Sequence, residues 1–251
     1  MKVLWLSANK LGYELLKTAV KVDGFELLGI VTLRPGSSTI MYDGVPADRW
    51  QEFGVPVHQV SNINDEENVI RSLCPDLIIV CGWRQLVGED IMKLPKNGII
   101  GFHPTLLPYG RGPAPIINTL LKGLTRSGLT MFYLGKGLDD GDLIGQAGIK
   151  IEPQDHAQDV YDKTIKAAKR LIKKYLPLVL SGRAPRVPQD NSRAVVFDKP
   201  VLENNRIDLS KESLEEAYQK IKALSKPYRG AYIEKDGKRL VIWRAELLEP
   251  K

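Results

Sequence analysis

One histidine in this sequence stands where chemistry is expected in an α/β protein. His103 follows directly on the apolar, β-rich run of residues 99–102. In an open parallel sheet, ligands collect beyond the carboxyl ends of the strands, so a side chain there can reach them. Neutral imidazole takes and returns protons readily near neutral pH. His103 is therefore the leading candidate for an acid or base, whereas His58 and His156 are better explained as surface or packing residues.

A glycine-flanked acidic turn supplies the second set of candidates. It carries Asp139, Asp140 and Asp142 and precedes a strand-like run at residues 143–151. Asp and Gly are common in ordinary β-turns, so the turn alone does not indicate a function. A carboxylate beside a histidine would, however, hold the tautomer of the ring and stabilise its charged form.

Short β-rich runs alternate with stretches of helical spacing, which predicts a mainly parallel sheet of the α/β class. The expected strands are residues 3–7, 27–33, 77–81 and 99–102. The expected helices are residues 11–20, 47–53 and 65–73, the last with Asn64 as its N-cap. Residues 103–115 contain four prolines and two glycines, which predicts a rigid loop without regular structure.

A second, smaller unit is expected near the carboxyl end of the chain. A long helical pattern at residues 155–180 ends in glycine and proline stop signals. A helix at residues 211–224 and two strands around the turn at 235–238 follow. We predict a catalytic domain at residues 1–185 and a small α+β subdomain at 186–251. A hairpin with a single helix buries little by itself, so this unit is a possible homodimer surface.

Composition narrows the class of protein further. The chain of 251 residues is 43% hydrophobic and carries a net charge of +6, which permits contact with phosphates without requiring it. No signal peptide or membrane span is visible, so a cytoplasmic location with no membrane partner is expected. Two cysteines, Cys74 and Cys81, suggest neither a disulfide framework nor a metal site. A run of cations on the long helix, at residues 163–174, is expected to form a solvated face.

The histidine and the acidic turn belong to two motifs in a specific order. Gly101-Phe102-His103 leads into Thr105-Leu106-Leu107-Pro108 and Arg111-Gly112, and Leu138-Asp139-Asp140-Gly141 follows. Here the chain resembles the folate-dependent formyltransferases, which show a strand, an Asn-x-His motif, a Ser/Thr-Leu-Leu-Pro loop with Arg-Gly, and a Leu-Asp-x-Gly turn in that order. Residues 188–190, 205–208 and 227–231 extend the likeness through the second unit, so its coverage is close to complete.

The resemblance implies a Rossmann-like fold and a set of roles. His103 matches the family's catalytic histidine and Asp139 its catalytic aspartate. The segment that cradles the pterin ring corresponds to Cys81, Gly82, Trp83, Arg84, Gln85 and Leu86, and Asp142 is expected to join it in binding the cosubstrate. That cosubstrate would be 10-formyltetrahydrofolate, the donor in one-carbon transfer. The chemistry requires no metal and no covalent enzyme intermediate.

One position departs from the family pattern. Gly101 replaces the asparagine whose amide is thought to donate a hydrogen bond to the formyl oxygen as charge develops there. Loss of such a donor typically lowers the rate about 100-fold to 1000-fold. Three explanations are open. His103 binds the oxyanion itself, another amide such as that of Asn118 substitutes, or the chain has lost transfer and kept binding. Retained activity is expected.

The acceptor is expected to be a small amine, in particular an amino sugar linked to a nucleotide. The resemblance to methionyl-tRNA formyltransferases is less complete, because the loop at residues 34–43 carries one cation and the second unit is short, so nucleic acid is an unfavoured partner. Candidate contacts to the acceptor are Lys10, Tyr109 and Arg111. A binding protein for folate or a sugar nucleotide, and a hydrolase that releases formate, are the alternatives.

Overall fold

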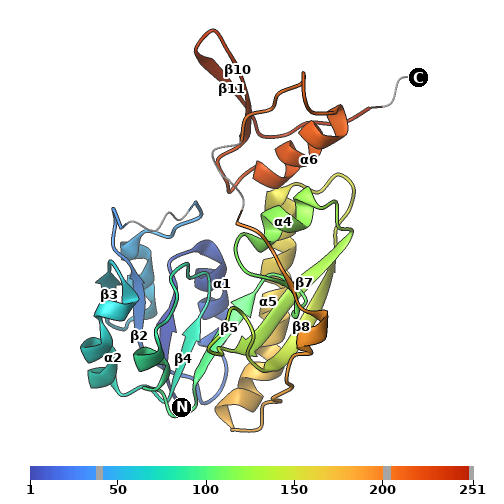
Figure 1. The fold of residues 1–251 in the computed structure, drawn as a ribbon. Coiled ribbons are helices and arrows are strands. Elements are labelled where there is room, and N and C mark those ends of the chain that lie inside the picture. Colours follow the sequence, from blue (N-terminus) through green and yellow to red (C-terminus); the bar gives the residue numbers. More distant parts are fainter. Residues whose placement is uncertain (38–41, 200–204, 249–251) are drawn as a thin grey trace.

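A computed structural model describes residues 1–37, 42–199 and 205–248. Its centre is a seven-stranded sheet in the order β3-β2-β1-β4-β5-β7-β8. The five parallel strands are β1 (Lys2–Leu6), β2 (Glu26–Leu33), β3 (Val57–Val60), β4 (Leu77–Val80) and β5 (Ile99–His103). Two antiparallel strands, β7 (Arg126–Tyr133) and β8 (Leu143–Lys150), complete one edge. The predicted Rossmann-like, mainly parallel sheet is confirmed (Figure 1).

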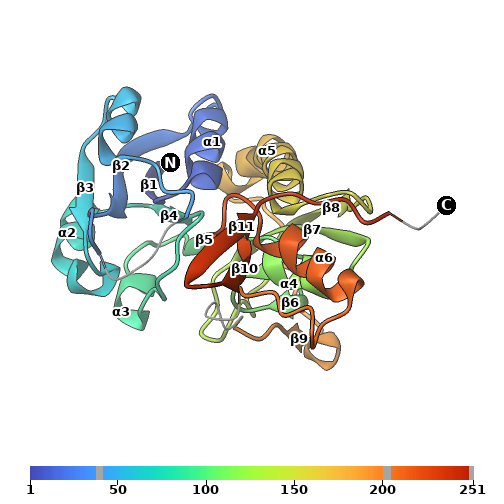
Figure 2. The same cartoon turned by 90° about the horizontal axis from the view of Figure 1, so that it is seen from above.

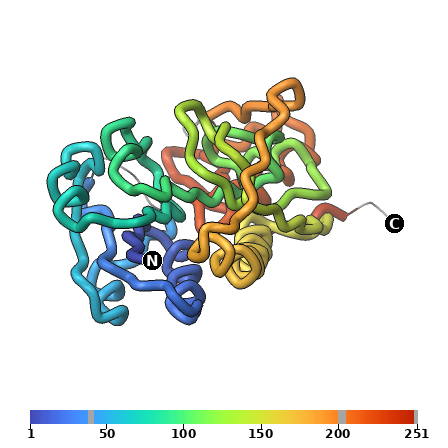
Figure 3. Tube along the Cα trace, turned by 90° about the horizontal axis from the view of Figure 1, so that it is seen from below, coloured from blue at the N-terminus to red at the C-terminus, as the bar shows by residue number. Residues whose placement is uncertain are grey.

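Helices cover both faces of this sheet. Alternate residues of β1 explain the two layers, because Val3 and Trp5 join one apolar cluster while Leu4 and Leu6 join the other. The first cluster packs against α1 (Lys10–Ala19) and α5 (Ala157–Leu180). The second packs against α2 (Glu67–Leu73) and α3 (Glu89–Met92). Viewed from below, the blue and cyan first half of the chain and the green to orange part that follows lie side by side (Figure 3).

The helix predicted at residues 47–53 is present, as the 3-10 helix η1 (Ala47–Phe53). Two local predictions were wrong. The helix expected from residue 65 begins at Glu67, after a separate 3-10 turn, η2 (Ile63–Asp65). Asn64 is therefore not its N-cap. Its side chain instead donates to the Leu86 carbonyl at 3.0 Å and accepts from the Gly88 amide at 2.7 Å.

The proline-rich segment after His103 is more regular than its composition predicts. Its residues form a short strand, β6 (Tyr109–Arg111), that pairs with β9 (Val195–Val196). The partner strand lies far along the chain, so local sequence gives no sign of it. The helix α4 (Pro115–Leu121) begins at the last proline of the segment, because proline suits the first turn of a helix, where its missing N–H is not needed.

The carboxyl-terminal unit lies above the carboxyl edge of the sheet, as Figures 1 and 2 show together. Its helix α6 (Leu214–Leu224) begins with a capping box between Ser213 and Glu216. A hairpin of β10 (Ala231–Lys235) and β11 (Lys238–Ile242) follows, and Leu240 on it is 66% exposed. The predicted small α+β unit is confirmed, while its boundary near residue 185 and the homodimer remain predictions. No described helix is long and apolar enough to cross a membrane.

Candidate active site

His103 ends β5 and is held between two acceptors. The residue is 7% exposed. Nε2 lies 2.7 Å from the Gly110 carbonyl oxygen, and since a carbonyl only accepts, this nitrogen carries the proton. Nδ1 lies 3.5 Å from Oδ2 of Asp139. Nδ1, on the other side of the ring, therefore faces a carboxylate oxygen.

Asp139 is fixed by the surrounding backbone. Its φ of 48° lies in the left-handed region, which Asp tolerates better than most residues. Oδ2 accepts a hydrogen bond from the Gly112 amide at 2.9 Å, and the Asp139 carbonyl accepts from the Gln189 side chain at 2.9 Å. The second carboxylate of the turn, Asp140, accepts from the Gly137 amide at 3.1 Å. The turn therefore holds Asp139 toward His103 while Asp140 stabilises the turn itself.

The position of the missing asparagine is filled by apolar side chains. Gly101 lies two residues before His103 on β5 and pairs with Phe132 of β7. A Cβ atom on Gly101 would lie 2.6 Å from Cδ1 of Leu134 and 3.0 Å from Cε1 of Phe132. The space beside Gly101 is therefore filled by the side chains of Phe132 and Leu134.

Asn118 does not stand in for that asparagine in this structure. Its amide nitrogen donates to three backbone carbonyls, those of Pro113 at 3.1 Å, Ala114 at 3.3 Å and Asp198 at 3.0 Å. An amide engaged in this way fixes the start of α4 against the returning chain. The structure therefore does not support the explanation in which the Asn118 amide replaces that of the missing asparagine.

The segment expected to hold the pterin begins at the end of β4. Cys81 is fully buried, and burial raises the pKa of its thiol, so it stays protonated and does not act as a nucleophile. Gly82 has a φ of 64°, and a Cβ there would overlap the side chain of Asn9, so only glycine fits. The end of β4 and the turn after β1 are thereby brought into contact.

The rest of this segment combines anchored and outward side chains. Gln85 accepts from the Ile63 amide at 2.9 Å and donates to the Ser61 carbonyl at 2.7 Å, which fixes the loop. The indole N–H of Trp83 is buried and has no acceptor among the described residues. Leu86 is 80% exposed. The loop is therefore anchored through Gln85 and presents Leu86 at the surface.

The candidate acceptor contacts are spread over two places. Lys10 opens α1 with an exposed ammonium 3.6 Å from Asp162. Tyr109 is exposed and sets its ring edge against Phe197. Arg111 is buried, with Nη2 2.8 Å from Gln189 Oε1 and 2.8 Å from Asn191 Oδ1. Asp142, expected to bind the cosubstrate, lies 3.9 Å from Arg186.

Gln189 is a residue that the sequence did not single out. It accepts from Arg111 and donates to the carbonyls of Asp139 and Gly141 at 2.9 and 2.8 Å, so it links the loop after His103 to the acidic turn. Because Gln189 lies 78 residues from Arg111, no local pattern could reveal the contact.

The variant Gln189→Leu is expected to lower the free energy of unfolding by about 1–3 kcal/mol, since it leaves buried polar groups unsatisfied. Urea denaturation measures this. Gln158→Leu is the matched control, because that glutamine bonds only its helix neighbour Asp162 within the described contacts. Equal stabilities for the two variants would contradict the role of Gln189.

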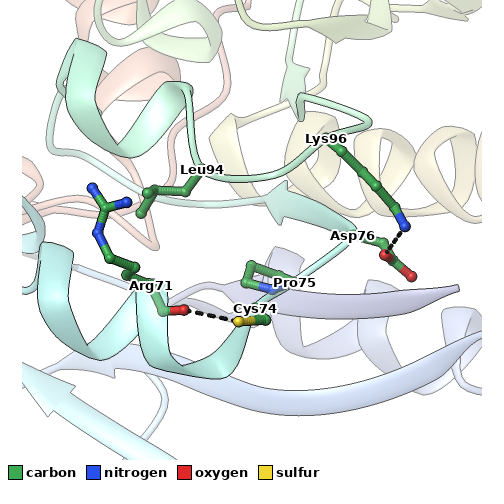
Figure 4. A pocket seen from close by; sticks show the side chains of 6 residues that line it. All are labelled: Arg71, Cys74, Pro75, Asp76, Leu94 and Lys96. Carbon is green, nitrogen blue, oxygen red and sulfur yellow. Dashed lines mark hydrogen bonds and ion pairs between the residues drawn. The ribbon is translucent and has the colours of Figure 1, made fainter.

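A cavity of about 340 Å³ lies elsewhere, at the amino edge of the sheet (Figure 4). It is lined by Arg71, Cys74, Pro75, Asp76, Leu94 and Lys96. Asp76 accepts from the Lys2 amide at 2.9 Å, which places the cavity at the start of β1, opposite to His103. Among the described residues, no group of three or more metal-ligating side chains comes together there or elsewhere.

Comparisons with known proteins give matches over most of the chain. The sequence matches the family model described as formyl transferase over residues 52–176 and the model of the formyl transferase C-terminal domain over residues 201–251. It is similar to the methionyl-tRNA formyltransferase of Bacillus velezensis, with 31% identity covering 100% of this chain and 80% of that protein.

Two solved structures share the fold. One is a 4-N formyltransferase from Francisella tularensis, with a TM-score of 0.79, 20% identity, and coverage of 99% of this chain and 98% of that one. The other is WlaRD, a sugar 3N-formyl transferase crystallised in the presence of dTDP and 5-N-formyl-THF. Its TM-score is 0.69 at 15% identity, covering 89% of this chain and 78% of that one.

Proposed function

Because this chain belongs to the formyl transferase family, we propose that it transfers the formyl group of 10-formyltetrahydrofolate to the amine of a nucleotide-linked amino sugar. Formyl transfer follows from the family, and the acceptor is the proposed part. The observation that carries the chemistry is the pairing of His103 with Asp139 at the carboxyl end of β5.

The reaction exchanges one carbon–nitrogen bond for another. The neutral acceptor amine attacks the formyl carbon, and the bond between that carbon and the folate nitrogen breaks. The proton that the amine loses passes to Nδ1 of His103 and then to the departing folate nitrogen. Asp139 holds the charged ring at 3.5 Å during the transfer. Binding both substrates at one edge of the sheet supplies much of the remaining acceleration.

The distribution of charge supports a small acceptor over tRNA. The α5 helix starts beside the carboxyl-terminal unit, where the Ala157 amide donates to Ser225 Oγ at 3.1 Å. Its exposed cations come later along the helix, toward the amino edge of the sheet: Lys166, Arg170, Lys173 and Lys174. Two further lysines, Lys163 and Lys169, pair with Asp155 and Glu14. The basic run therefore lies away from His103 and does not surround the site.

The names of the solved relatives favour the same acceptor class. WlaRD is a sugar 3N-formyl transferase whose crystals were grown in the presence of dTDP, and the Francisella protein is a 4-N formyltransferase. The methionyl-tRNA formyltransferase of Bacillus velezensis supports the second candidate, a tRNA acceptor. A folate-binding protein and a formyl-folate hydrolase are further alternatives, since Gly101 replaces the family asparagine.

An acceptor panel tests the proposal. The purified chain is incubated with 10-formyltetrahydrofolate and, separately, with 3-amino and 4-amino sugars linked to dTDP or UDP, the same amino sugars without nucleotide, and methionyl-tRNA. Mass spectrometry identifies the product. We expect a formylated amino sugar from one nucleotide-linked acceptor and a much slower reaction without the nucleotide. Formylated methionyl-tRNA as the main product would replace the proposed acceptor with tRNA.

The apolar wall beside Gly101 makes a separate prediction. The variant Gly101→Asn is expected to lose about 1–3 kcal/mol of stability, because the added side chain must displace Phe132 and Leu134. It is expected to gain no rate of transfer. Gly148→Asn is the matched control, since a Cβ on that strand glycine meets only the Ser127 carbonyl oxygen, at 4.0 Å. A Gly101→Asn variant that is stable and transfers faster would contradict this prediction, because it would show that the site still accommodates and uses an asparagine.

A further inference from the structure

The sheet reverses its strand order between β1 and β4. From β1 the chain builds outward to β2 and β3, and then crosses to β4 and β5 on the other side. Ligands of open α/β sheets bind outside the carboxyl ends of the strands at this switch point. An anion there is commonly held by the free amides at the start of the first helix. The start of α1 is therefore the first place to look for a phosphate site.

In this chain those amides are already engaged. The Lys10 amide donates to the Asp43 carbonyl at 3.0 Å, and the Leu11 amide donates to the Tyr161 hydroxyl at 2.9 Å. The Gly12 and Tyr13 amides donate to the side chain and the carbonyl of Asn9, at 3.1 and 3.0 Å. The Asp43 carboxylate, which accepts from Tyr161, adds negative charge beside them. A phosphate at this crevice must be bound by side chains instead.

Two guanidinium groups contact one tyrosine ring near this switch point. Arg84, from the loop after β4, lies 5.1 Å from the centre of the Tyr42 ring, and Arg229 lies 5.4 Å from it. The ring edge of Tyr228 packs on Tyr42 with centres 5.9 Å apart. Tyr42 is next to Asp43, which bonds α1 and α5. Segments from both units of the chain thus converge beside the start of α1.

Arg229 has the properties of an anion ligand. Its side chain is exposed, and no described carboxylate lies within ion-pair distance of it. A ring contact engages the face of a guanidinium and leaves the N–H donors in its plane for an anion. Burial raises the pKa of the neighbouring Tyr228 hydroxyl, so that group stays neutral and adds no repulsion. Arg84, whose guanidinium also lies against the Tyr42 ring, adds a second positive charge near Arg229.

We propose that Arg229, together with Arg84, binds a phosphate group of the acceptor over the crevice between β1 and β4, so that the carboxyl-terminal unit completes the acceptor site. The inference rests on the proposed function in taking the phosphate-bearing molecule to be the acceptor. The phosphate belongs to a nucleoside diphosphate. A phosphate at the 3′ end of a tRNA has the same chemistry. The experiment distinguishes these two sources of the phosphate.

Calorimetric titration with dTDP, UDP and inorganic pyrophosphate tests the proposal without requiring turnover. We expect Arg229→Ala to weaken binding of the diphosphate at least about 10-fold, and Arg229→Lys to recover part of it, since charge-assisted hydrogen bonds contribute about that much. Arg84→Ala is expected to act in the same direction. Arg239→Ala is the matched control, because its guanidinium pairs with Glu234 and packs on Tyr232 of the hairpin. Thermal unfolding verifies that each variant is folded.

The outcomes separate the inference from the proposed function. Unchanged diphosphate binding by Arg229→Ala, or no diphosphate binding by the unaltered chain, would overturn the inference. Tighter binding of a tRNA 3′-end mimic than of any diphosphate would also overturn it in favour of tRNA. Diphosphate binding lost in Arg229→Ala, in a chain that formylates no amino sugar, would leave the inference standing while the function fails. If Arg229→Ala formylated an amino sugar with an unchanged KM for the acceptor, the proposed function would stand and the inference would fail.

Discussion

The variant His103→Ala is expected to lower the rate of formyl transfer by between about 100-fold and 10,000-fold while folate binding persists. In the proposed reaction His103 takes the proton of the attacking amine; in the structure its Nε2 is held by the Gly110 carbonyl and its Nδ1 faces Asp139. Alanine removes both the base and the charge that stabilises the developing oxyanion. Single-turnover mixing with saturating acceptor measures the rate, and fluorescence titration measures folate affinity.

The matched control for this variant is His58→Ala. His58 lies on β3, at the far edge of the sheet from β5. We expect its transfer rate to stay within a factor of a few of the unaltered chain. A transfer rate in His103→Ala equal to that of the control would remove His103 from the mechanism.

The variant Asp139→Asn is expected to reduce the transfer rate at least about 100-fold, because a neutral amide no longer stabilises the protonated ring. Asparagine tolerates the left-handed backbone at this position and can still accept from the Gly112 amide, so the turn should keep its shape. The rate is measured across pH. We expect the rate to fall throughout the range, because the amide carries no charge at any pH.

Asp140→Asn provides the comparison within the same turn. Its carboxylate accepts from the Gly137 amide and does not approach His103 in the described contacts. We expect a small change in stability and a transfer rate close to that of the unaltered chain. If Asp140→Asn lowered the rate as much as Asp139→Asn, the effect would come from the shape of the turn rather than from the charge beside the ring.

Much of the fold was predictable because its signals are local. The alternation of Val3, Leu4, Trp5 and Leu6 between two apolar clusters is the period of a strand buried on both faces, and β5 ends at the histidine as expected. The hairpin turn at residues 235–238 was also visible, since Asp236 and Gly237 both adopt positive φ. Such features depend on neighbours in sequence.

The parts that were missed depend on distant partners. The strand β6 exists because Val195 and Val196 return to pair with it, and the proline content of its segment argued against any strand. Arg111 was expected to contact the acceptor, yet its guanidinium is bonded to Gln189 and Asn191. The amides of α1 are capped by Asp43 and by Tyr161, which lies 150 residues from Leu11. Sequence order alone shows none of these contacts.

The candidate site also contains some features that the motifs revealed and others that depend on distant contacts. His103 and Asp139 were named from the two motifs, and the structure brings them to 3.5 Å of each other. Gly101 was recognised as a departure, but the chain contains no local sign that Phe132 and Leu134 fill the vacated position. Arg84 was assigned to the pterin segment by position, and its guanidinium lies toward Tyr42 instead of along the loop. The position of a residue in a motif does not predict the direction of its side chain.

The most direct test of the account is the rate at which 10-formyltetrahydrofolate is consumed with and without an amino-sugar nucleotide. We expect consumption that requires the acceptor, saturates with it, equals the formylated amine produced, and falls in both His103→Ala and Asp139→Asn. Equal consumption without acceptor, with release of formate, would identify a hydrolase. Tight folate binding with no consumption under any condition would mean that the pairing of His103 with Asp139 no longer carries out transfer.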